Sequence, residues 1–146
     1  MDKPAIHAEV KSIVNQKLER IQQLITETRA SNSETKSSMG DKYETGREML
    51  QQEINKLQIQ ANHLHEMLQI LNKIMVNEHT NIQHGSLVLT NHAMYYISVS
   101  AGELMHQEAK IFAVSAQSPV AKLLLGRKAG NTIEIAGTIQ QILEVY

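Results

Sequence analysis

The chain of 146 residues contains no cysteine and no tryptophan, and it has only one phenylalanine and two prolines. The absence of cysteine excludes disulfide bonds, thiolate metal ligands and cysteine nucleophiles, and it is typical of proteins in a reducing compartment. Because aromatic residues make up only 3% of the chain, the sequence supplies neither a base-stacking platform nor an aromatic-walled ligand pocket. The core must therefore be largely aliphatic.

The sequence also lacks long apolar runs and an excess of charge of one sign. No run approaches the length of about 18 residues that a membrane span needs, and no apolar stretch follows the first basic residue as in a secretory signal. The chain carries 14 Lys and Arg against 15 Asp and Glu, a balance that fits neither a disordered chain nor one that coats nucleic acid. We expect a soluble, cytoplasmic protein without a membrane partner.

Glycine and proline divide the chain into two parts. Before residue 77 the only proline is Pro4 and the only glycines are Gly40 and Gly46, whereas the second part has five glycines, Pro119 and short β-branched runs. This change in composition predicts a helical first part and a β-rich second part, and so a fold of the α+β class. The predicted domains are residues 1–77 and 82–146.

Apolar residues at heptad spacing mark the helical part. The stripe with alternating spacings of four and three residues consists of Leu50, Ile54, Leu57, Ala61, Leu64, Leu68, Leu71 and Met75. A less regular stripe runs through residues 6–25. Together they predict helices over residues 4–30 and 41–76 that form an antiparallel coiled-coil hairpin with its tip near residues 31–44. A parallel dimer through the second helix is the alternative.

The β-rich part contains five apolar runs that predict strands, at residues 86–90, 93–100, 110–115, 132–136 and 138–145. A short helix interrupts them, with Ser118 as its N-cap and Pro119 at the first helical position. Gly126 follows the helix where a left-handed residue is favoured. We expect a small antiparallel sheet packed on this helix.

Residues 111–133, IFAVSAQSPVAKLLLGRKAGNTI, resemble the C-terminal signature of the GreA/GreB family of bacterial transcript-cleavage factors. The shared pattern is a strand, then Ser-Pro, an aliphatic helix, Gly-Arg-Lys and a turn of glycine with an acid or amide. Residues 84–89 are similar to the family's first strand of the same domain, and residues 40–44 resemble its Gly-Asp-x-x-Glu motif. The resemblance implies an FKBP-like C-terminal domain. After Glu44, residues 45–48 depart from the family's usual asparagine, alanine and aromatic residue.

The resemblance further implies a factor that binds bacterial RNA polymerase through its secondary channel and stimulates cleavage of backtracked RNA. Ser118 and Pro119 would dock at the channel rim. Asp41 and Glu44, at the hairpin tip, would act beside the RNA 3′ end and help to hold a Mg²⁺ shared with the polymerase active site. Such a factor is not itself an enzyme, binds no cofactor stably and has no small-molecule substrate.

Several alternatives remain open on the sequence. Asp41 and Glu44 also match a capping box at the start of the second helix, with Asp in place of the usual Ser or Thr. Two alternatives to a cleavage factor are a channel-binding inhibitor or regulator without cleavage activity, and a coiled-coil dimerisation scaffold.

The seven histidines do not follow a metal-ligand pattern. His63 and His65 are two residues apart, so a helix turns them to different faces. The histidines of the second part sit alone in loops or at strand ends: His79, His84, His92 and His106. We therefore predict no metal site that belongs to the chain itself.

Overall fold

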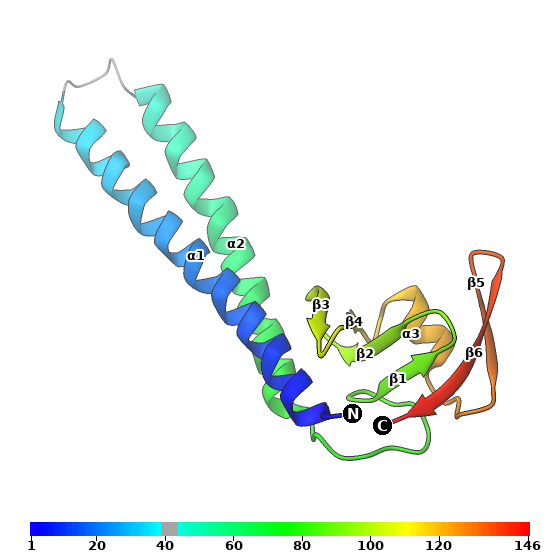
Figure 1. Ribbon diagram of the computed structural model, residues 1–146. Coiled ribbons are helices and arrows are strands. Elements are labelled where there is room, and N and C mark those ends of the chain that lie inside the picture. The colour runs from blue at the N-terminus through cyan, green and yellow to red at the C-terminus, as the bar shows by residue number, and fades with distance from the viewer. Residues whose placement is uncertain (39–43) are drawn as a thin grey trace. The chain divides into compact units, whose positions relative to one another are not determined.

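The computed structural model describes the backbone of residues 1–38 and 44–146, and the side chains of residues 1–32 and 46–146. Within this part, two long helices precede a sheet and one short helix (Figure 1). The elements are α1 (Lys3–Ser38), α2 (Glu44–Lys73), β1 (Leu87–Thr90), β2 (Met94–Ser98), β3 (Gly102–His106), β4 (Ala109–Ser115), α3 (Pro119–Leu124), β5 (Thr132–Ile135) and β6 (Thr138–Val145). The predicted α+β class, with a helical hairpin before a sheet, is confirmed.

The chain forms two compact units. One comprises Met1–Ile13 and Gln69–Tyr146, and the other comprises Val14–Leu68. The first unit therefore contains the N-terminal end of α1, the C-terminal end of α2 and the strands. The domains predicted from the sequence instead divide the chain where helices give way to strands. None of the helices in the described part combines the length and hydropathy that crossing a membrane requires.

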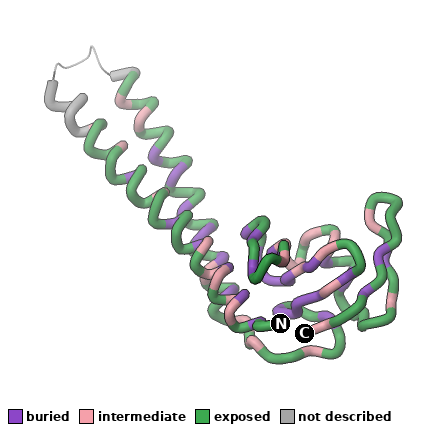
Figure 2. The backbone as a smooth tube through the Cα atoms, in the orientation of Figure 1, coloured by how far each residue is buried: buried purple, intermediate pink, exposed green. Residues whose placement is uncertain are grey.

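The unit Val14–Leu68 is an antiparallel pair of helices (Figure 1). Buried apolar residues recur along both helices (Figure 2), and each is at most 7% exposed: Val14, Leu18, Ile25, Ile54, Leu57, Ala61, Leu64 and Met67. Most of the heptad stripe therefore lies between the helices, as predicted, because these positions return to one helix face every three or four residues.

The ends of the helices differ from the prediction. Helix α1 continues to Ser38 instead of ending near residue 30. Most of its residues after 30 are serine, threonine or asparagine, which are poor helix formers, but none is glycine or proline. Extending an existing helix through them therefore costs only a few tenths of a kcal/mol per residue. Helix α2 ends at Lys73, and Met75, which the stripe placed in the core, is 72% exposed.

The strands form one sheet in the order β3-β4-β2-β1-β6-β5. All neighbours are antiparallel except β2 and β4, which run parallel from Met94↔Ile111 to Ser98↔Ser115. The prediction of an antiparallel sheet was wrong for this pair because it missed β3. That edge strand adds one reversal of the chain, so β4 returns parallel to β2 and lies between β2 and β3.

Three tight turns connect neighbouring strands in the described part of the chain, and the one between β5 and β6 consists of Ala136 and Gly137, with φ angles of +49° and +81°. The predicted turn at Asn91 and His92 is confirmed, with the Thr90 amide donating to the Ala93 carbonyl over 2.9 Å. The turn between β3 and β4 consists of Gln107 and Glu108, whose φ angles are +47° and +68°. Two positive φ angles normally favour Asn-Gly, so the sequence carried no signal for this second hairpin.

Helix α3 packs on one face of the sheet. The buried cluster there consists of Ile82, Val88, Ile97, Ala121, Leu124, Ile133 and Ile142. Tyr96 precedes Ile97 in β2 and therefore points to the other face, where it is fully buried. Both faces are thus covered within this unit.

Candidate functional site

The predicted tip carboxylates fall at the boundary of the described residues. Asp41 lies outside them. Glu44 is the first residue of α2, and its side chain also lies outside them. The metal-binding role of this pair and its alternative as a capping box therefore stay predictions.

The predicted docking residues begin α3. Ser118 has extended backbone angles, φ −64° and ψ 152°, and its Oγ accepts the amide of Ala121 over 3.2 Å. Pro119 occupies the first turn and is exposed. The N-cap and the proline position are as predicted, because each removes an unsatisfied amide donor at the helix start.

The far end of α3 is joined to the segment before β1. Gly126, with φ +82°, donates its amide to the Ile82 carbonyl over 2.8 Å, and the Ile82 amide donates to the Arg127 carbonyl over 2.8 Å. Ala121 and Leu124 have no exposed surface. These bonds and contacts fix the orientation of α3, so that its outer surface is presented rigidly.

The outer surface of α3 combines positive charge with apolar area. We define it as Pro119, Lys122, Leu123, Arg127 and Lys128. Leu123 is 37% exposed, and its carbonyl accepts the Arg127 Nε–H over 2.8 Å. All three charged members are cations, so this surface suits a partner with acidic and apolar groups.

A second group of polar contacts joins α1 to the sheet inside the unit that contains Met1–Ile13. His7 Nδ1 lies 2.6 Å from the Tyr96 hydroxyl. Burial lowers the pKa of His7, with a smaller lowering by Lys11, against a hydrogen bond to the Leu71 backbone that raises it. Burial also raises the pKa of Tyr96 to about 12. A neutral imidazole therefore accepts the hydrogen bond of a protonated phenol.

His106 is not solitary, contrary to the sequence prediction. Its Nδ1 lies 2.6 Å from Glu9 Oε1, and its side chain is 8% exposed against 41% for Glu9. The Nε2 atom has no hydrogen-bond partner in the described part of the chain, so the Nδ1–H tautomer that donates to the carboxylate fits the site. The sequence held no signal for this pair, because its members are far apart along the chain.

Lys3 joins three segments of the same unit. Its Nζ donates to the Asn77 carbonyl and, over 2.9 Å, to the Tyr146 carbonyl. Lys3 is 4% exposed, and burial lowers its pKa although Glu78 acts in the opposite direction. The amine therefore has a structural role at this position.

Two further histidines of this unit, His79 and His84, contact a hydroxyl group or a backbone carbonyl. His79 Nδ1 lies 2.8 Å from Ser86 Oγ, and His84 Nε2 lies 3.1 Å from the Ser98 carbonyl. Among the residues that the structure describes, no three His, Asp or Glu side chains gather so that they could hold a metal ion.

Comparison with known proteins gives structural neighbours only. No family model and no curated protein matches the chain. The chain is similar to GreA factor homolog 1 (Gfh1) of Thermus thermophilus at 18% identity and a TM-score of 0.42, over 93% of this chain and 94% of that chain. It is similar to Gfh1 of Thermus aquaticus at 18% identity and a TM-score of 0.35, over 91% of each chain. A further structure of the transcription factor Gfh1 aligns at 18% identity and a TM-score of 0.39.

Proposed function

We propose that the chain is a Gre-type transcription factor that binds bacterial RNA polymerase through its secondary channel. The observation that supports this proposal is the local fold of the signature residues. Ser118 caps α3, Pro119 occupies its first turn and Gly126 takes the left-handed conformation after it. These residues carry the resemblance in sequence, and they follow a long helical hairpin, as that resemblance implies.

In this proposal, the outer surface of α3 docks at the rim of the channel. Lys122, Arg127 and Lys128 supply positive charge, and Leu123 supplies apolar area. Cations on a rigid, partly apolar surface favour rapid association with an acidic site. They also fix how the two surfaces are aligned in the complex. Pro119 contributes by holding the first turn in place.

The hairpin would carry Asp41 and Glu44 to the polymerase active site. Carboxylate oxygens are the ligands that Mg²⁺ prefers, so the donor set suits this ion. A Mg²⁺ shared with the polymerase would supply activation of water and stabilisation of charge on the phosphate. The two carboxylates would bind and position the Mg²⁺, whereas the polymerase would perform the cleavage. The chain is therefore not an enzyme on its own.

A channel-binding inhibitor is the second candidate. The observation that favours it is the sequence after Glu44, where residues 45–48 depart from the family pattern. In the inhibitor, the hairpin would occupy the channel without stimulating RNA cleavage.

The docking step can be tested by competition for core RNA polymerase. We expect Pro119→Ala and Lys122→Glu to weaken binding several-fold while the melting temperature changes little, because both side chains are exposed. Lys73→Glu is the matched control, since it makes the same charge change at the exposed end of α2. Equal binding by all four proteins would remove this surface from the proposal. If the wild-type chain does not bind core RNA polymerase and light scattering shows a dimer, the coiled-coil dimerisation scaffold is favoured.

The tip can be tested by cleavage in stalled, backtracked elongation complexes. Asp41→Asn and Glu44→Gln keep side chains that can cap a helix but remove the charge. We expect both to abolish most stimulated cleavage, to retain polymerase binding and to change helix stability by only a few tenths of a kcal/mol. A wild-type chain that binds polymerase but stimulates no cleavage at any Mg²⁺ concentration would favour the inhibitor.

A further inference from the structure

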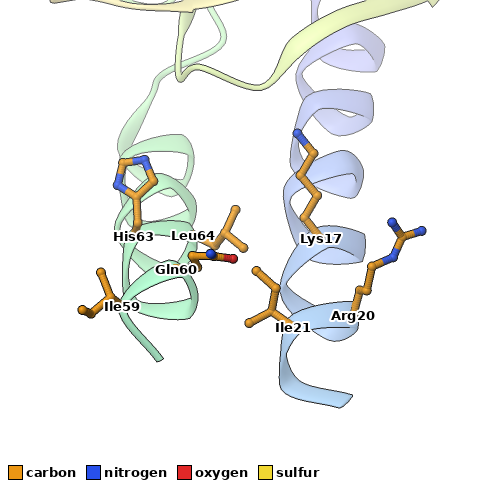
Figure 3. Close-up of a pocket in the computed structure, with 7 residues that line it drawn as sticks. All are labelled: Lys17, Arg20, Ile21, Ile59, Gln60, His63 and Leu64. Atoms are coloured by element: carbon orange, nitrogen blue, oxygen red, sulfur yellow. The ribbon is translucent and has the colours of Figure 1, made fainter. Parts of the chain in front are cut away.

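A groove crosses one side of the helical hairpin within the unit Val14–Leu68 (Figure 3). Its cavity volume is about 470 Å³. Ile21 of α1 and Leu64 of α2 point toward each other between the helices, and Ile59 lies on the outer flank of α2 (Figure 3). Ile21 and Leu64 give the groove an apolar floor, and Ile59 adds apolar area at its edge.

The apolar floor of this groove contrasts with the lining of a second recess on the same hairpin. Ile59 is 69% exposed, so the groove leaves a large apolar side chain in contact with water. A second recess on the same hairpin surrounds Ile25 and Ala61 with polar side chains, Gln22, Thr26, Arg29, Gln58 and His65. The usual gap between two paired helices therefore does not by itself explain the exposed isoleucine.

The rim of the groove is positively charged along α1. Lys17 and Arg20 line it, and none of its seven lining residues is acidic. Arg20 makes no hydrogen bond or ion pair with any residue in the described part of the chain. On the α2 side, His63 lies 4.0 Å from the exposed Glu66, so one carboxylate lies beside that flank.

We propose that this groove binds an amphipathic helix from an acidic partner protein. The partner's apolar residues, at positions i, i+3 or i+4, and i+7, would lie on Ile21, Ile59 and Leu64. Its carboxylates would face Lys17 and Arg20. The complex would be a three-helix coiled coil, and the proposal does not depend on polymerase binding.

The spacing of the cations favours a helix over a small anion. Lys17 and Arg20 are three residues apart on α1, so their Cβ atoms are about 5 to 6 Å apart along one face. Two acids three or four residues apart on a partner helix have the same spacing. A single alkyl carboxylate would present apolar area but only one negative charge.

A designed peptide pair tests the proposal. The acidic probe is a fluorescein-labelled helical peptide with Leu at the a and d positions of three heptads and Glu at the flanking positions. The basic probe has Lys at those flanking positions. We expect saturable 1:1 binding of the acidic probe to the full chain by fluorescence anisotropy, and at least tenfold weaker binding of the basic probe.

Substitutions in the groove should change these affinities in opposite directions. Ile59→Ser should weaken binding of the acidic probe about fivefold or more, because it removes apolar contact area. It should not affect folding, because the side chain is exposed. Lys17→Glu with Arg20→Glu should abolish binding of the acidic probe and create binding of the basic one. Arg20→Glu alone should change both probe affinities in the same directions as the double variant. It replaces the double variant if that protein melts at a lower temperature than the wild-type chain. The matched control is Arg29→Glu with Lys56→Glu, the same charge change elsewhere on the hairpin.

Two results would overturn the proposal. The first is an acidic probe that fails to bind, or that binds the control and the groove variants equally. The second is decanoate that binds with the same dependence on Ile59 and Arg20 and displaces the peptide, since this would assign the groove to an alkyl anion.

Discussion

His7 Nδ1, in the first turns of α1, lies 2.6 Å from the hydroxyl oxygen of Tyr96 in β2. The two rings meet edge to face, with centroids 6.0 Å apart. Tyr96 is fully buried, so its hydroxyl depends on the imidazole in place of water. This contact attaches the beginning of α1 to the middle of the sheet in the same compact unit.

Loss of the imidazole should leave a buried hydroxyl without a partner. We expect His7→Leu to lower the free energy of unfolding by about 1 to 3 kcal/mol, the usual effect of an unsatisfied buried polar group. Urea unfolding at about pH 8, where the imidazole is neutral, measures this change.

Tyr96→Phe provides the second side of a double-mutant cycle. Because the double variant has no orphaned hydroxyl, its loss of stability should be smaller than the sum of the two single losses by about 0.5 kcal/mol or more. Additive losses would mean that the hydrogen bond contributes nothing.

Stability should decline as the pH falls below the ordinary histidine pKa of about 6.5. Burial lowers the pKa of His7 and of His79 in the folded chain, so the unfolded chain takes up these protons first. The decline should level off below the folded-state pKa values. His7→Gln keeps an amide oxygen that can accept from Tyr96, and it should make the decline between about pH 8 and about pH 5 shallower.

The control for the pH dependence is His65→Gln, because His65 is exposed on α2. Thermal melts over the same pH range should give this variant the slope of the wild-type chain. If His7→Gln also keeps the wild-type slope, the imidazole of His7 does not contribute to the acid sensitivity.

The hairpin should distinguish a buried from an exposed apolar residue on the same helix. Leu64 is 7% exposed and Ile59 is 69% exposed. We expect Leu64→Asp to cost about 3 kcal/mol or more, because it buries an unpaired charge. Ile59→Asp should change stability by no more than about 0.5 kcal/mol. Circular dichroism melts compare the two, and equal melting temperatures would contradict the packing of α2.

Two glycines with open surroundings should respond oppositely to alanine. Neither Gly46 nor Gly126 has an atom within 4 Å of an added Cβ, but Gly126 has a φ of +82°. Gly126→Ala should therefore destabilise by about 1 to 2 kcal/mol through backbone strain alone. Gly46→Ala, in the first turns of α2, should stabilise by up to about 1 kcal/mol. Changes of the same sign in denaturant unfolding would contradict this assignment of backbone conformation.

The elements predicted correctly are those whose signals are local. The spacing of Leu57, Ala61 and Leu64 defines one helix face, and Ser118 with Pro119 defines a helix start. Each signal depends on side chains within a turn or two of one another, which is the range over which sequence patterns determine conformation.

The features that were missed depend on distant partners or on unusual backbone angles. Strand β3 is held by pairing with β4 through a turn at Gln107 and Glu108, residues that rarely adopt positive φ. The contact between Glu9 and His106 joins two positions that no local pattern relates. The predicted tip site stays open because Asp41 lies outside the described residues.

The place of β6 in the sheet has a consequence for the order of folding. Strand β6 lies between β1 and β5, although it is the last strand in sequence. Pairing Val88 with Val145 closes a long loop, and closure entropy makes such contacts slow to form. During synthesis, residues 14–68 have all their helical partners available early, whereas β1 keeps one edge open until β6 emerges. The sheet is therefore the stage of folding at which this chain is most vulnerable to aggregation.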